Sequence, residues 1–267
     1  TKDVLLERLK EKGWKLKKLP WFDLGFYVIE PKYQIGNSLE HRLGYFYMQG
    51  PASMVPPIVL DPRPYEVVLD MCAAPGSKTT QIAAMMQNKG IIVANDVELK
   101  RITALRSNLQ RCGVINTVVT MIDGRRLSRI KQKFDKVLLD APCTGDGTIR
   151  MNPEVMKMWS VRGARALSRL QRSLILSAFD TLKEGGILVY STCSLNPEED
   201  EYVVDYLIKN RKNARIEPIR IDGLKFREGL TEWEGMKFDD ELSKTIRIYP
   251  HDNDTEGFFV AKVMKVD

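Results

Sequence analysis

The sequence predicts an α/β fold in which helices cover both faces of a mostly parallel sheet. From about residue 66 onward, short β-branched apolar segments alternate with longer segments of helical apolar spacing, and this alternation is typical of such sheets. The 43% hydrophobic content suits a globular chain with a core, and no run of about 18 apolar residues predicts a membrane span. In folds of this kind, ligands bind beyond the carboxyl ends of the strands.

A small α+β appendage is predicted ahead of the main domain. Residues 4–12 have helical apolar spacing that Gly13 would end, and residues 21–30 are typical of short strands. A proline-rich stretch at residues 56–64 marks a junction. The sequence therefore predicts an appendage of residues 1–60 and a main domain of residues 61–267.

The main domain is predicted to contain seven strands and four helices. Strands are expected at residues 66–70, 91–95, 117–122, 136–140, 187–191, 215–218 and 257–263. Helices are expected at residues 78–88, 99–113, 163–182 and 198–209. Gly113 would end the second of these helices, and Gly185-Gly186 would stop the third.

Histidine and cysteine usage excludes several enzyme classes. The chain has two histidines, which leaves too few imidazoles for most metalloenzymes and histidine-based hydrolases. None of its four cysteines forms a Cys-x-x-Cys pair, so no metal site is expected, and reduced thiols in a cytoplasmic protein are predicted. The net charge of +6 favours a polyanionic partner only modestly, because ordinary solubility charge explains it equally well.

A loop of small residues, DMCAAPGSKT at residues 70–79, follows the first strand of the main domain and opens a helix. Small residues let a ligand approach the backbone, and a helix N-terminus offers free N–H groups. The phosphate-binding pattern G-x-x-x-x-G-K-[ST] and the dinucleotide pattern G-x-G-x-x-G are both absent. The sequence predicts a nucleoside-binding loop of another type, with a purely structural turn as the alternative.

Acidic residues stand at the ends of three successive strands. They are Asp70, Asp96 and Asp123. Asp96 is placed to accept hydrogen bonds from ribose hydroxyls, and Asp123 to meet an adenine edge. Each acid alone is more often a turn or helix-cap residue, but three in succession favour a binding site.

Two cysteines follow the next two strands. Cys143 lies in DAPCTG at residues 140–145, and Cys193 lies in STCS at residues 191–194. A lone cysteine is usually a small buried apolar residue. Two cysteines at neighbouring strand ends, each beside hydroxyl residues, favour a catalytic role.

These three segments, in this order and spacing, resemble the Sun-type RNA (cytosine-5) methyltransferases, in particular their archaeal single-domain tRNA members. The segments MQGPAS at 48–53 and 247–259 also resemble the family, although Gly50 stands where an acidic residue is frequent. The resemblance implies a Rossmann-like class I methyltransferase fold with a seven-stranded, mostly parallel sheet. It also implies S-adenosylmethionine as cofactor and RNA as partner. The compactness of the chain favours tRNA over rRNA as the substrate.

The resemblance also implies roles for individual residues. Cys193 would add to C6 of cytosine as a nucleophile, Asp140 would hold the N3 side of the base, and Cys143 would assist release of the product. Lys78 would supply a cation that lowers the thiol pKa, although a solvated helix lysine is the alternative. The implied cofactor-binding residues are Cys72, Ala73, Ala74, Pro75, Gly76, Ser77, Lys78, Asp96, Arg101, Asp123 and Asp140. Arg101 is equally well explained as an ordinary surface residue.

Several alternatives stay open. A methyltransferase acting on an exocyclic amine or a protein would leave Cys193 idle, and a DNA enzyme would use Cys143 as its nucleophile. A non-catalytic RNA-binding assembly factor would bind the cofactor without turnover. The predicted RNA contacts are the appendage, the basic residues Arg125, Arg126, Arg129, Lys131 and Lys133, and a helical row of Arg162, Arg165, Arg169 and Arg172, for which solvated faces are the alternative. A monomer is expected.

Overall fold

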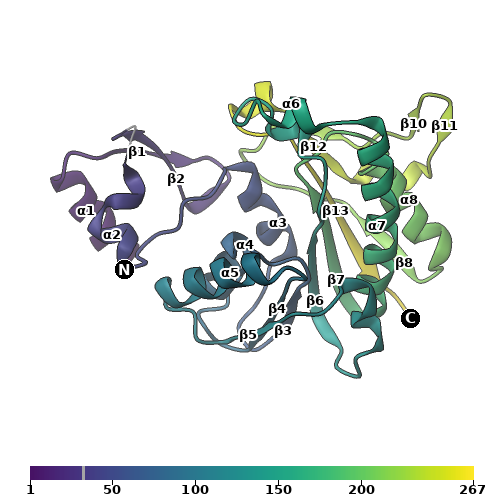
Figure 1. Cartoon of the computed structure of the whole chain (residues 1–267), viewed down its shortest axis with the longest axis horizontal. Helices are drawn as coiled ribbons and strands as arrows, with labels where there is room; N and C mark the ends of the chain where they lie inside the picture. The colour runs from purple at the N-terminus through teal and green to yellow at the C-terminus, as the bar shows by residue number, and fades with distance from the viewer. Residues whose placement is uncertain (32–33) are drawn as a thin grey trace.

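The computed structural model describes residues 1–31 and 34–267, and it has the predicted α/β architecture (Figure 1). Within the described residues, the main sheet has nine strands. Eight lie in the order β5 (Thr117–Thr120), β4 (Ile91–Asn95), β3 (Val67–Asp70), β6 (Phe134–Asp140), β7 (Leu182–Thr192), β13 (Phe258–Lys265), β12 (Ile246–Ile248) and β9 (Arg227–Glu228). The ninth, β8 (Ala214–Glu217), pairs with β13. Two more strands than the expected seven are present because β9 and β12 are too short to leave a sequence pattern.

Five of the strands run parallel, and this orientation gathers their carboxyl ends at one edge. β3 pairs in parallel with β4 and β6, β4 with β5, and β6 with β7. The strands β8, β9, β12 and β13 add antiparallel pairings on the other side of β7. Loops that leave β3, β4, β5, β6 and β7 therefore emerge together, which is where ligands bind in such sheets.

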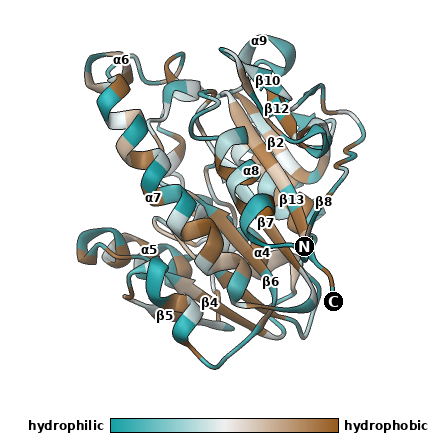
Figure 2. Cartoon of the chain, turned by 90° about the vertical axis from the view of Figure 1, so that its right-hand side faces the viewer, coloured by the Kyte–Doolittle hydropathy of each residue, from teal (hydrophilic) through white to brown (hydrophobic). Residues whose placement is uncertain are grey.

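Helices cover both faces of the sheet. On one face, α7 (Val161–Asp180) and α8 (Glu201–Asn210) pack against a core that includes Val137 and Tyr190. On the other, α3 (Val55–Leu60) and α4 (Ser77–Met85) pack around Leu138 and Val189, and α5 (Leu99–Arg111) packs on Ala94. Successive residues of a strand point to opposite faces, so a strand that is covered on both faces needs consecutive apolar residues. Figure 2 shows the strands of the sheet in apolar colours.

The predicted boundary between α7 and β7 was wrong, and the helix expected at residues 198–209 begins only at Glu201. Helix α7 ends at Asp180 and β7 already begins at Leu182, so Gly185-Gly186 lies inside β7 rather than between a helix and a strand. The pairing with β6 is irregular there, since Phe134 pairs with Leu182 whereas Lys136 pairs with Ile187. Glycines inside a strand often mark such a bulge, because they adopt the backbone angles that it requires, and Gly185 has φ of 72°.

The N-terminal part forms a separate small layer beside the main domain (Figure 1). It contains α1 (Lys2–Glu11), a hairpin of β1 (Lys15–Leu19) and β2 (Phe22–Glu30), and α2 (Leu39–Arg42). Strand β1 was not predicted, because its sequence KLKKL is mostly charged. Helix α3, by contrast, is packed into the core of the main domain. The boundary at residue 60 stays a prediction. No helix in the described ranges is long and apolar enough to cross a membrane.

Truncation of a side chain in the central strand should destabilise the fold. Leu138 of β6 has no exposed surface, so we expect Leu138→Ala to lower the free energy of unfolding by about 3 kcal/mol through lost burial and a residual cavity. Ile115 is 83% exposed, so Ile115→Ala should change the free energy of unfolding by less than about 0.5 kcal/mol. Urea unfolding of both variants measures the difference, and equal effects would contradict the assigned core.

Candidate active site

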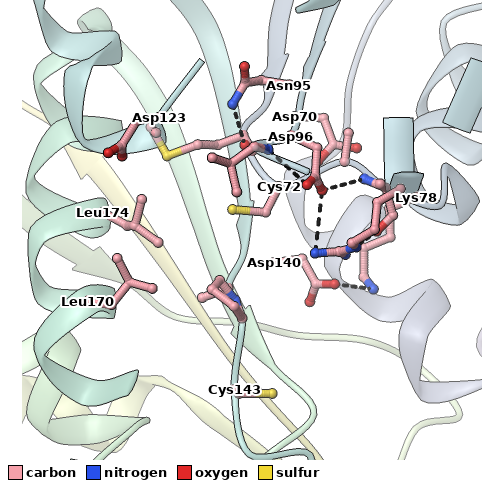
Figure 3. A pocket seen from close by; sticks show the side chains of 18 of the residues that line it. Asp70, Cys72, Lys78, Asn95, Asp96, Asp123, Asp140, Cys143, Leu170 and Leu174 are labelled. Atoms are coloured by element: carbon pink, nitrogen blue, oxygen red, sulfur yellow. Dashed lines mark hydrogen bonds and ion pairs between the residues drawn. The ribbon is translucent and has the colours of Figure 1, made fainter. Parts of the chain in front are cut away.

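A cavity of about 640 Å³ opens at the carboxyl edge of the parallel strands (Figure 3). Its walls include every predicted catalytic and cofactor-binding residue except Gly76. Leu170 and Leu174 of α7 form an apolar wall opposite Lys78. The size and the mixture of an apolar wall with a few polar groups are typical of sites for small molecules.

The loop after β3 is held against its neighbours by backbone hydrogen bonds. Met71 N donates to Leu138 O at 2.9 Å, and Ala73 N donates to Asn95 O at 2.7 Å. Gly76 precedes α4 with φ of 106°, a conformation that favours glycine, and an added Cβ would lie 3.0 Å from Leu105 Cδ1. Gly76 therefore shapes the loop without lining the cavity.

Asp70 is the most deeply buried acid of the cavity wall. Its Oδ2 accepts a hydrogen bond from Thr79 Oγ1 at 2.7 Å, and its Oδ1 has no hydrogen-bond partner among the described residues. Burial raises the pKa of Asp70 to about 7. An unpartnered buried acceptor that lines a cavity is the kind of atom that a ligand donor satisfies.

Asp96 and Arg101 are both joined to the loop after β3. Asp96 Oδ2 accepts from Ala74 N at 3.2 Å and lies 3.5 Å from Arg101 Nη1, while Arg101 Nη2 donates to Ala74 O at 2.6 Å. Asp96 Oδ1 accepts from the backbone N–H groups of Val97 and Glu98. Asp96 is thus a turn residue as well as a cavity residue, so both interpretations of this acid agree with its geometry.

Asp123 lies in the loop after β5 and lines the cavity. Its carboxylate accepts from Arg125 N at 3.0 Å and Arg125 Nη2 at 2.6 Å. The adjacent Arg125 guanidinium holds the pKa of Asp123 below its usual range.

Asn95 is a cavity residue that sequence reasoning missed. Its Nδ2 donates to Met71 O at 3.1 Å and Ile122 O at 2.9 Å, and its Oδ1 accepts from Ile122 N at 2.9 Å. One amide therefore ties together the loops after β3 and β5 (Figure 3). Its position as the last residue of β4, directly before Asp96, was the available signal.

Lys78 and Asp140 form an ion pair at the cavity floor. Lys78 Nζ lies 2.7 Å from Asp140 Oδ2 and donates to Ser53 Oγ at 2.8 Å, while Ser191 Oγ donates to Asp140 Oδ1 at 2.8 Å. Each Asp140 oxygen therefore accepts one hydrogen bond, which fixes the orientation of the carboxylate. In the described part of the chain, Lys78 makes no hydrogen bond to either sulfur; its charge faces Asp140.

The two cysteines converge as their strand positions predict. Cys143 Sγ lies 3.3 Å from Cys193 Sγ, and both residues line the cavity. The hydrogen bond with Cys193, together with burial, raises the pKa of the Cys143 thiol well above its usual range. Either sulfur can donate in this contact, and the raised pKa favours the protonated form of Cys143. Burial also raises the pKa of the Cys72 thiol, which makes it a neutral part of the wall.

Comparison with known proteins identifies the family. A family model described as 16S rRNA methyltransferase RsmB/F matches residues 57–264. The chain belongs to this family. It is a methyltransferase with the class I fold, so the resemblance and the fold predicted from the sequence are confirmed. Such a family implies the use of S-adenosylmethionine.

Individual relatives are similar over nearly the whole chain. A tRNA (cytosine(49)-C(5))-methyltransferase of Pyrococcus abyssi is 47% identical, with 97% of this chain and 83% of that protein covered. A ribosomal RNA small subunit methyltransferase F of Vibrio atlanticus is 41% identical, but the chain spans only 54% of its length. Among solved structures, a Pyrococcus horikoshii methyltransferase homolog has a TM-score of 0.89, 38% identity and coverage of 100% and 83%. NSun6 of the same organism, solved with SFG, has a TM-score of 0.76, 38% identity and coverage of 91% and 60%.

Replacement of Asp70 should flatten the dependence of stability on pH. Its pKa is about 7 when folded against an ordinary 3.8, so between these values the folded state binds more protons than the unfolded state. The stability that neutral Asp70 contributes is present below about pH 4 and is lost as the pH rises through about 7. In urea unfolding measured from pH 4 to pH 8, the free energy of unfolding should decline less for Asp70→Asn than for the wild type. The exposed Asp222→Asn variant is the control, and equal slopes for Asp70→Asn and wild type would contradict the buried pKa.

Proposed function

We propose that this chain is an S-adenosylmethionine-dependent RNA (cytosine-5) methyltransferase that acts on tRNA through a covalent adduct between Cys193 and C6 of the base. The observation that carries the proposal is the pair of thiols 3.3 Å apart at the wall of the cavity, beside an oriented carboxylate. An enzyme acting on an exocyclic amine needs neither thiol. A protein that only binds RNA needs no such arrangement.

The cavity residues fit S-adenosylmethionine. The unpartnered Oδ1 of Asp70, the carboxylates of Asp96 and Asp123 and the apolar wall of Leu170 and Leu174 supply acceptors and an apolar surface for a nucleoside with an amino acid tail. A family relative solved with SFG, an analogue of this cofactor, supports the assignment. When bound, S-adenosylmethionine supplies the electrophilic methyl group that C5 of the base accepts.

The protein residues activate and orient the base. A Cys193 thiolate adds to C6, which makes C5 electron-rich. Asp140 accepts from Lys78 and Ser191, and a carboxylate has about four lone-pair sites, so about two remain for the N4–H group of a cytosine and for N3–H of the ring protonated at N3, the form that takes up the electron pair pushed into the ring by the thiolate. Loss of the C5 proton then restores the double bond and expels Cys193. Cys143, as a protonated neighbour, donates a hydrogen bond to the departing sulfur.

The RNA must present an extruded base, since the thiols lie at a cavity and not on a flat surface. Arg162, Arg165 and Arg169 of α7 are exposed and are available to phosphates, although Arg165 also pairs with Glu198 at 3.3 Å. Arg172 is unsuited to this role, because its guanidinium packs over the rings of Tyr202 and Tyr206. We propose that the appendage of residues 1–60 adds further RNA contacts to the catalytic domain of residues 61–267.

The choice of tRNA rests on the Pyrococcus abyssi relative, which matches at higher identity and over more of its length than the rRNA enzymes. The experiment is bisulfite sequencing of total RNA incubated with the protein and S-adenosylmethionine. We expect new 5-methylcytosine in tRNA. Methylation confined to rRNA would support the second candidate substrate, and methylation of neither would overturn the proposal.

The two cysteines should have separable roles. We expect Cys193→Ala to abolish methyl transfer and to form no covalent complex, because the nucleophile is lost. Cys143→Ala should accumulate a denaturant-resistant enzyme–RNA complex, because addition proceeds without efficient release. Denaturing gels with labelled tRNA measure both. A complex formed by Cys193→Ala but not by Cys143→Ala would reverse the assignment and favour the arrangement of DNA enzymes.

Replacement of Asp96 should weaken cofactor binding. Asp96→Asn removes the charge and one acceptor, and hydrogen bonds to charged groups contribute about 1.5–3 kcal/mol, so the Kd for S-adenosylmethionine should rise about 10- to 100-fold. Titration calorimetry measures the change, with Asp222→Asn as an exposed control. An unchanged Kd would show that Asp96 serves only the turn.

A further inference from the structure

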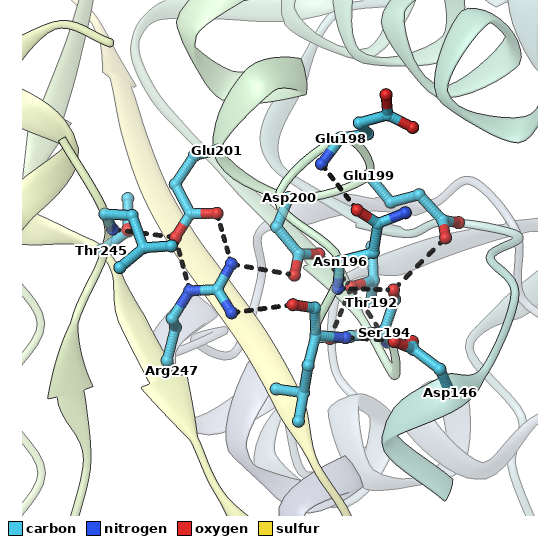
Figure 4. A network of polar contacts seen from close by, with 12 residues as sticks. Asp146, Thr192, Ser194, Asn196, Glu198, Glu199, Asp200, Glu201, Thr245 and Arg247 are labelled. Atoms are coloured by element: carbon cyan, nitrogen blue, oxygen red, sulfur yellow. Dashed lines mark hydrogen bonds and ion pairs between the residues drawn. The ribbon is translucent and has the colours of Figure 1, made fainter. Parts of the chain in front are cut away.

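Three consecutive acids that lead into α8 and end at its first residue are completely buried, although none lines the cavity. They are Glu199, Asp200 and Glu201 (Figure 4). Buried Arg247 pairs with Glu201 through Nε at 2.6 Å and lies 3.5 Å from Asp200, so Glu199 is left without a cationic partner in the described chain. Burial of a carboxylate is costly unless hydrogen bonds satisfy it.

Glu199 obtains those hydrogen bonds from the loops that carry the two thiols. Its Oε2 accepts from Thr144 N at 3.0 Å and from Gln171 Nε2 at 3.0 Å. Its Oε1 accepts from Thr144 Oγ1 at 2.5 Å and Ser194 Oγ at 3.3 Å. Thr144 follows Cys143 and Ser194 follows Cys193, so one carboxylate joins both loops.

The contacts bracket each cysteine on both sides. Gln171 Nε2 also donates to Pro142 O at 2.8 Å, which ties down the residue before Cys143. Thr192 Oγ1 donates to Asp200 Oδ1 at 2.5 Å, which ties down the residue before Cys193. The loops also touch directly, because Gly147 N donates to Cys193 O at 3.0 Å.

We propose that Glu199 is a positioning residue that sets the distance between the Cys143 and Cys193 sulfurs and thereby controls release of the methylated base. The inference rests on the proposed function. In release, the C5 proton passes to solvent, its electron pair forms the C5=C6 bond, and the C6–S bond breaks with its pair returning to Cys193. A thiol 3.3 Å away stabilises that sulfur by a hydrogen bond, and a displaced thiol does not.

The formation and the release of the adduct should respond differently to loss of Glu199. Addition to C6 requires Cys193 and Asp140, whose carboxylate is held by Lys78 and Ser191 and not by Glu199. Release requires the second thiol in place. Glu199→Ala should therefore resemble a Cys143 variant and leave cofactor binding intact.

The test follows enzyme–RNA complexes on denaturing gels together with turnover. We expect Glu199→Ala to accumulate the complex and to lower kcat on the order of 10- to 100-fold, while the Kd for S-adenosylmethionine changes by less than about twofold. Glu199→Gln should restore release, since its amide oxygen can face Thr144 N and Gln171, and its amide nitrogen can donate to the rotatable hydroxyls of Thr144 and Ser194. Thr144→Val and Ser194→Ala each remove one hydroxyl contact and provide milder variants if Glu199→Ala does not fold.

Asp205→Asn is the matched control, because Asp205 is a buried acid of the helix α8 that follows Glu199, accepts from Lys209 Nζ at 2.7 Å and from Asp239 N at 3.0 Å, and contacts neither thiol loop. It should lower stability without accumulating the complex. Normal turnover by Glu199→Ala would show that Glu199 has no role in release. Parallel loss of cofactor binding, complex formation and thermal stability would show a purely structural role, and either result would overturn the proposal.

A second readout does not need activity. Diamide, an azo oxidant that takes two hydrogens from a pair of thiols, should form the Cys143–Cys193 disulfide faster in the wild type than in Glu199→Ala, as quantified by mass spectrometry of the linked peptides. Equal rates would overturn the proposal. If the wild type forms no 5-methylcytosine and yet shows this difference in rate, the proposed function fails while the effect of Glu199 on thiol geometry stands.

Discussion

The pairing of β6 with β7 is the constraint on which the candidate site depends. Asp140 pairs with Ser191 in this parallel register, and Ala141 N donates to Ser191 O at 2.9 Å, so the two strands end side by side. The loops that follow then carry Cys143 and Cys193 to within hydrogen-bond distance. A shift by one residue would move one sulfur about 3.3 Å along the strand and turn its side chain to the opposite face. The apolar packing on both faces that enforces this register thus also sets the chemistry.

Polar contacts between neighbouring loops convert the common strand edge into an ordered site. Asn95 joins the loops after β3 and β5, the Lys78–Asp140 pair joins α4 to the end of β6, and Glu199 joins the loops after β6 and β7. Asn95, Lys78 and Glu199 are buried, and the desolvation of such groups is offset only when their partners are in place. Such contacts make the loops act as one unit, so a ligand that binds the loop after β3 meets thiols that are already oriented.

Much of this arrangement could be predicted from the sequence because its signals are local. Strand–helix alternation predicted the parallel sheet, and residues that directly follow strands predicted where Asp96, Asp123 and the cysteines converge. Contacts between distant segments left no such signal. Glu199 looks like one acid in an ordinary charged run, and nothing in its neighbours shows that Thr144, 55 positions away, donates to it. Gly185-Gly186 was misread for a related reason, since a glycine pair predicts a break and only the pairing partner shows a bulge.

The same geometry explains why a pair of cysteines suits the proposed chemistry better than one. A sulfur that must first add to a ring and then leave needs to be a good nucleophile and a stable anion at different moments. A second thiol at 3.3 Å is within hydrogen-bond distance of the departing sulfur, and its hydrogen bond with Cys193, together with burial, raises the pKa of that second thiol well above its usual range. A single buried cysteine would have only the cavity wall around it, and low polarity disfavours a thiolate. In the proposed reaction the second thiol therefore favours the step in which the carbon–sulfur bond breaks, whereas addition to C6 does not require it.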